Sequence, residues 1–131
     1  MIASMIVLTC AHNIYHRGKK KTPTDLKFTP AMNGKKGRDP VKVKKCHYPE
    51  EYRTLLEGFS EYDFAILELE EALERNYGYL GIDYRGENLK GVEEMEVCGY
   101  PDDKESHTMW NAFGPCTDDT EALLKYKIAT K

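Results

Sequence analysis

Residues 62–69 read YDFAILEL, and they form the strongest strand signal in the chain. A short apolar run of this length is typical of a strand buried inside a sheet. Outward from it, residues 2–9 are rich in β-prone residues, and residues 41–46, 94–100 and 124–128 alternate apolar with charged or polar residues. Many short strands separated by glycine and proline predict an all-β barrel or sandwich.

The remaining segments predict little helix. Residues 10–17 favour one helical turn, and residues 49–56 a short turn or helix. Residues 26–32 favour a strand interrupted by Pro30, and residues 77–91 favour loops around short strands.

The C-terminal segment has two interpretations. Alternation at residues 124–128 predicts a strand, whereas Thr117 followed by Glu121 could begin a helix as an N-cap. We prefer the strand.

The composition and charge of the chain argue against several classes of function. The chain has 131 residues, enough for one modest domain, with 40% hydrophobic residues, 31% charged residues and a net charge of −3. This weak acidity gives no reason to expect nucleic acid or an anionic membrane as partner. No apolar run approaches the ~18–20 residues that span a bilayer. Residues 1–8 are apolar but lack a basic flank and a cleavage site, so we expect a strand there and no secretory signal.

Four cysteines stand at positions 10, 46, 98 and 116, and no pair has the C-x-x-C spacing of a zinc or redox motif. Their three possible pairings stay open. We expect most of them to be free, buried, small apolar residues.

The histidines give little support for a metal. His12 and His16 are four residues apart, but Asn13 stands where the H-E-x-x-H motif requires glutamate. His47 and His107 are isolated in the sequence, so we expect no metal site and no cofactor. The basic run formed by Arg17, Lys19, Lys20 and Lys21 predicts a solvated loop. No aromatic stacking platform is interleaved with it, so we do not expect nucleic-acid binding.

Two segments carry candidate catalytic residues. Residues 7–15, VLTCAHNIY, contain Thr9, Ala11 and His12 in a strand followed by T-x-A-H. Residues 61–69, EYDFAILEL, place Asp63 ahead of the apolar run, where a buried carboxylate needs a partner; a strand-start cap is the alternative. The two segments resemble those of trypsin-like serine proteases, which implies that His12 is the general base and Asp63 its orienting carboxylate.

A third segment, residues 97–114, narrows the resemblance to glutamyl endopeptidases. It resembles their GYP-x-D-K, MW and G pattern, and Tyr126 and Thr130 resemble the residues leading to their serine segment. The matching residues are Gly99, Tyr100, Pro101, Asp103, Lys104, Met109, Trp110 and Gly114.

The resemblance implies an all-β, trypsin-like double β-barrel present only in part, with the first barrel over about 1–75 and the start of the second over about 76–131. It implies a serine endopeptidase that acts on peptide or protein substrates through an acyl-enzyme, in a parent enzyme that is secreted. The G-x-S-G segment is absent, so we expect the chain alone to be inactive. The alternatives are a non-catalytic, protease-like interaction module and a plain β domain; the oligomeric state is left open.

Three structural consequences follow from this interpretation. The His12 ring and the Asp63 carboxylate should approach within about 2.6–3.2 Å. A strand should end and turn at 99–101. Trp110 and Met109 should pack in the core or between barrels, with Trp110 largely buried.

Overall fold

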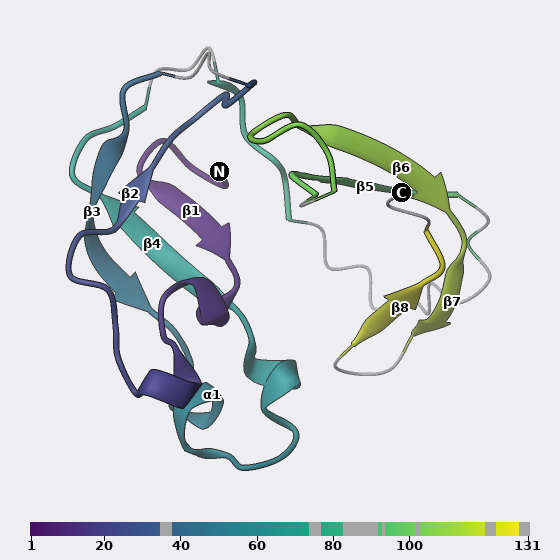
Figure 1. The fold of residues 1–131 in the computed structure, drawn as a ribbon, viewed down its shortest axis with the longest axis horizontal. Coiled ribbons are helices and arrows are strands. Elements are labelled where there is room, and N and C mark those ends of the chain that lie inside the picture. The colour runs from purple at the N-terminus through teal and green to yellow at the C-terminus, as the bar shows by residue number, and fades with distance from the viewer. Residues whose placement is uncertain are drawn as a thin grey trace. The chain divides into compact units, whose positions relative to one another are not determined.

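The structure is a computed structural model that divides into two compact units (Figure 1). Unit 1 comprises Met1–Pro30 and Asp39–Asp83, and unit 2 comprises Ala31–Arg38 and Tyr84–Lys131. The predicted division into barrels near residue 75 stays a prediction. The residues that the structure describes are 1–34, 38–73, 77–82, 92, 94–101, 103–119 and 123–128.

Unit 1 is built on one antiparallel sheet. Its strands are β1 (Ile6–Thr9), β2 (Lys27–Phe28), β3 (Val41–His47) and β4 (Ala65–Leu69), in the order β1-β4-β3-β2. Strand β4 therefore lies between β1 and β3 (Figure 1). The predicted strand over 26–32 is limited to β2 and ends before Pro30, whose nitrogen has no proton for the ladder.

Strand β4 confirms the buried strand predicted from YDFAILEL. Ala65, Leu67 and Leu69 are buried, whereas Ile66 and Glu68 lie on the opposite, partly exposed face. This alternation follows from the two-residue period of a strand. The first residues of the predicted segment do not join the sheet.

The core of unit 1 lies on the buried face of β4. The short helices of this unit are η1 (Ala11–Asn13), η2 (Arg17–Lys19), α1 (Glu50–Thr54) and η3 (Phe59–Tyr62). Helices η1 and α1 contribute Ala11 and Tyr52 to the core. The helical turns predicted near residues 10–17 and 49–56 are confirmed. No helix among the described residues is long and apolar enough to cross a membrane. The buried core residues are Val7, Ala11, Ile14, Tyr15, Tyr52, Ala65, Leu67, Leu69 and Leu73.

Unit 2 contains two separate hairpin-like pairs. Strand β5 (Met95–Gly99) pairs with β6 (Trp110–Gly114), and β7 (Cys116–Asp119) pairs with β8 (Leu124–Tyr126). The predicted strand end at 99–101 is confirmed, since β5 stops at Gly99. The C-terminal strand is confirmed over Leu124–Tyr126.

The burial predicted for Trp110 is wrong, and the alternative interpretation of Thr117 as a helix N-cap does not hold. Thr117 lies within β7; Glu121 lies outside the described residues. Trp110 is 48% exposed and Met109 is 58% exposed, so neither is largely buried. Trp110 pairs with Gly99, which has no side chain to cover the indole, and the Lys104 ammonium lies 5.2 Å from its ring centroid.

All four cysteines are free, but the prediction that most are buried is wrong. Cys116 is buried and Cys46 partly so, whereas Cys10 and Cys98 are exposed. Strand alternation puts Cys98 on the same exposed face as Glu96, two residues away, and the Cys98 thiol donates to the Glu96 carboxylate.

Candidate active site

His12 lies in the short helix η1, which begins two residues after β1 ends. Cys10 is extended and precedes η1, and the fully buried Ala11 anchors the turn in the core. The turn is closed by backbone bonds from Ile14 and Tyr15 N–H to the Ala11 carbonyl. These contacts fix the His12 backbone while its side chain stays 58% exposed.

Asp63 lies between η3 and β4. Its backbone N–H donates to the Ser60 carbonyl at 3.2 Å, and this bond fixes the backbone from which the carboxylate extends. The register of β1 against β4 pairs Thr9 with Ala65, so the chain leaving β1 lies beside the chain entering β4. The sheet thereby brings together two residues that are 51 positions apart.

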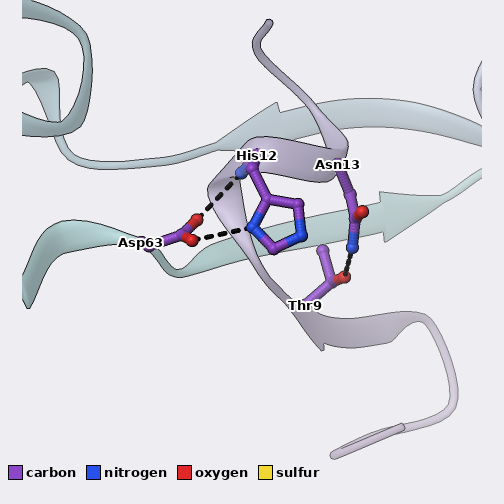
Figure 2. Close-up of polar contacts among 4 residues, drawn as sticks. All are labelled: Thr9, His12, Asn13 and Asp63. Carbon is purple, nitrogen blue, oxygen red and sulfur yellow. Dashed lines mark hydrogen bonds and ion pairs between the residues drawn. The ribbon is translucent and has the colours of Figure 1, made fainter. Parts of the chain in front are cut away.

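The contact between His12 and Asp63 has two points (Figure 2). The His12 backbone N–H donates to Asp63 Oδ1 at 2.9 Å, and His12 Nδ1 lies 2.7 Å from Asp63 Oδ2. The predicted distance is therefore confirmed. Each carboxylate oxygen engages one group of the same residue, which fixes the ring's orientation and leaves Nε2 directed away from Asp63 (Figure 2).

The environment keeps Asp63 ionised. Partial burial alone would raise the pKa of its carboxyl group, but the His12 ring and His12 N–H bonds, the His12 charge and the Ala11 N–H outweigh that effect. The net result is a pKa below the ordinary aspartate value. A carboxylate that stays charged can hold the imidazole in one tautomer and stabilise the imidazolium form.

A second contact tightens the same turn. The Asn13 side-chain amide donates to Thr9 Oγ1 at 3.0 Å (Figure 2). It joins the end of β1 to the end of η1, one residue after His12. The sequence did not reveal this contact: there, Asn13 excludes a metalloprotease motif and stands where trypsin has a disulfide cysteine.

Arg17 is not part of a solvated loop, and that prediction is wrong for it. Its guanidinium lies 3.9 Å from the Phe59 ring centroid and 5.5 Å from that of Tyr52, and it donates to the Leu55 carbonyl. By contrast, the side chains of Lys19, Lys20 and Lys21 are exposed as predicted. Aromatic residues 35 and 42 positions after an arginine are too common a pattern to have revealed this packing.

Two further histidines have neighbours that the sequence did not reveal. His47 Nε2 lies 2.7 Å from Glu68 Oε1, across the β3–β4 pair. His107 Nδ1 lies 3.0 Å from the Ser106 hydroxyl. Strand register brings the first pair together, whereas the second is a contact between adjacent residues in unit 2.

Metal ligation finds no support in the described parts of the chain, which contain no group of three or more histidine, cysteine, aspartate or glutamate side chains suited to an ion. His12 and His16 do not share a helical face, because η1 ends at Asn13. His16 instead accepts a bond from the Lys19 N–H.

Comparisons with known proteins bear on the fold and on the family resemblance. No family model matches the chain. It is 29% identical over 131 residues to a glutamyl endopeptidase of Bacillus licheniformis, an alignment that includes 99% of this chain and 40% of that protein. A solved structure of a Glu endopeptidase superposes with a TM-score of 0.80 at 22% identity, over 98% of this chain and 65% of that one.

The chain thus spans less than half of the curated relative and under two thirds of the solved one. Within that span it has the predicted all-β, trypsin-like fold, as the superposition shows. The resemblance to trypsin-like, Glu-specific endopeptidases that the three sequence segments indicated is confirmed.

Proposed function

We propose that this chain supplies the histidine and the aspartate of a serine endopeptidase triad, with His12 as general base and Asp63 as the carboxylate that orients it. The two-point contact between these residues carries the proposal. The resemblance to glutamyl endopeptidases supports it, because it covers both segments.

In the proposed reaction His12 Nε2 removes the proton from a serine hydroxyl as the oxygen attacks the peptide carbonyl. His12 then gives that proton to the leaving amine, and an acyl-enzyme forms. A water molecule, activated in the same way, hydrolyses the ester and restores the serine. Asp63 accepts a hydrogen bond from His12 Nδ1–H throughout the reaction and stays ionised, in keeping with its lowered pKa.

None of the three serines in the chain is the proposed nucleophile. Ser4 precedes β1, Ser60 lies within η3 and Ser106 contacts its neighbour His107. None has the flanking glycines that expose a nucleophile and supply oxyanion donors. We therefore expect residues 1–131 alone to have no serine-type peptidase activity.

The proposed substrates are peptides or proteins. Cleavage after acidic residues is the specificity that the relatives' names indicate, and we extend it to this chain as part of the proposal. The alternative is a protease-like interaction module that binds without catalysis.

The test compares residues 1–131 with the chain extended by about 100 residues, the size of a further domain. Peptide libraries with acidic and non-acidic cleavage positions report activity and specificity. In the active, extended chain, His12→Ala and Asp63→Asn should each lower kcat by about 10⁴ or more.

The matched control is His47→Ala, which removes a histidine from a second histidine–carboxylate pair in the same sheet. It should leave kcat unchanged. Full activity of His12→Ala would remove His12 from the mechanism. Cleavage by residues 1–131 that serine-directed inhibitors block would show that one of the three serines is the nucleophile.

A further inference from the structure

Arg17 joins two parts of the chain that are distant in sequence. It begins η2, five residues after His12. Its Nη2 donates to the Leu55 carbonyl at the end of α1, and its guanidinium lies over the ring of Phe59, the first residue of η3. Asp63 follows η3 directly.

The aromatic residues that Arg17 contacts are anchored in the core of unit 1. Tyr52 is buried in the core, and its ring meets that of Phe59 edge to face, with centroids 6.1 Å apart. The Arg17 guanidinium contacts both rings, so it rests on an aromatic pair that is itself anchored in unit 1.

The chemistry of the contact is specific to arginine. Its Nη1 is buried and has no hydrogen-bond partner among the described residues, while the centre of the guanidinium lies over the Phe59 ring. A guanidinium tolerates this because it is planar, weakly hydrated and attracted to ring faces. A lysine ammonium is compact and strongly hydrated and cannot reproduce the stacked arrangement.

We propose that Arg17 is a positioning residue: by joining the segment that carries His12 to the segment that carries Asp63, it holds the His12 ring and the Asp63 carboxylate within hydrogen-bond distance. The inference rests on the proposed catalytic pair for its functional meaning. Arg17 and Asp63 also act on the same group: burial raises the pKa of the Tyr52 hydroxyl, the Asp63 charge raises it further, and the Arg17 charge opposes the rise.

The test uses residues 1–131 and needs no nucleophile. Arg17→Met keeps aliphatic packing on the rings, and Arg17→Lys keeps the charge. The matched control, Lys19→Met, removes a charge from an exposed side chain in the same turn. Carbon-13 NMR titration follows the Asp63 carboxyl group, and hydrogen exchange follows the His12 amide, with the β4 amides as a measure of folding.

Both Arg17 variants should raise the Asp63 pKa toward its ordinary range, because the bonds from His12 that lower it are loosened. The His12 amide should exchange roughly five- to tenfold faster, as expected for one weakened hydrogen bond. Lys19→Met should change neither quantity, and β4 should exchange as in the unmodified chain.

Three outcomes overturn the proposal. The first is that the Asp63 pKa and the exchange rate of the His12 amide are unchanged in both variants. The second is that Arg17→Lys behaves like the unmodified chain. The third is that the exchange rates of the β4 amides rise as much as that of the His12 amide. The second result would mean that charge alone acts, and the third that Arg17 only stabilises the unit. Each is distinct from failure of the catalytic proposal, which the His12→Ala assay detects.

Discussion

Unit 1 and unit 2 are both made of strands, yet they bury very different numbers of side chains. Unit 1 has a four-stranded sheet with nine buried hydrophobic residues around β4. In the described part of unit 2, Cys116 is the one buried hydrophobic residue, and Trp110 and Phe113 are about half exposed. Two-stranded sheets are marginally stable alone, so strand content by itself does not make a core.

The difference bears on function because the candidate catalytic pair lies in the unit with the core. His12 and Asp63 follow and precede strands of one sheet, and Ala11 and Ala65, next to or near them, are fully buried. The exposed His12 side chain and the partly exposed Asp63 side chain are thus attached close to residues that are anchored in the core.

The largest effect is expected from a cavity in unit 1. Leu69→Ala removes a fully buried side chain from the central strand and should lower the free energy of unfolding by about 2–5 kcal/mol. Urea unfolding, monitored through hydrogen exchange of the β4 amides, measures this free energy.

Leu56→Ala is the matched control, since Leu56 is 90% exposed. Its effect should stay within about 0.5 kcal/mol. Equal losses for both variants would mean that the core of unit 1 is not where the structure locates it.

A smaller effect is expected in unit 2, at Gly114. A Cβ there would lie 2.7 Å from the Lys127 carbonyl oxygen and 2.8 Å from Ile128 Cγ1, so Gly114→Ala must displace backbone. Such overpacking costs about 1–3 kcal/mol. The fluorescence of Trp110, the single tryptophan, reports the unfolding of unit 2.

Gly99→Ala is the control in the paired strand, because no atom of the described residues lies within 4 Å of its Cβ position. The unfolding transition reported by Trp110 fluorescence should be the same in Gly99→Ala as in the unmodified chain. A Gly114→Ala variant as stable as Gly99→Ala would show that β6 does not pack against residues 127–128.

The smallest effect concerns pH and returns to unit 1. The folded pKa of Asp63 lies below its unfolded value of about 3.9. Its stabilising contribution is therefore complete above the unfolded pKa and is lost as pH falls through the folded pKa. Asp63→Asn should cost roughly 1 kcal/mol at neutral pH and little in strong acid.

The free energy of unfolding, measured through the β4 amides at pH values from 7 to 2, reports this loss of stability. The curves of Asp63→Asn and the unmodified chain should converge at the acid end. Parallel curves would mean that the carboxylate gains nothing from His12 on folding.

Local patterns in the sequence predicted strands of unit 1, and the resemblance to trypsin-like proteases predicted the approach of His12 to Asp63. The apolar run of β4 and the strand–turn before His12 are decided by residues close in the chain. Other features depend on distant partners: Trp110 is exposed because its strand neighbour is Gly99, and His47 meets Glu68 through strand register. The packing of Arg17 could not be predicted locally, because it depends on the rings of Phe59 and Tyr52 lying together next to its guanidinium.

The strand order β1-β4-β3-β2 also has a consequence for how the chain assembles. His47 and Glu68 are 21 residues apart, whereas His12 and Asp63 are 51 apart. The extra loop costs under about 1 kcal/mol in closure entropy, but contacts between distant residues form more slowly. During synthesis, β1 has no partner strand until β4 has left the ribosome. We therefore expect β3 and β4 to pair first and β1 to dock last, so that the His12–Asp63 contact is a late event in folding.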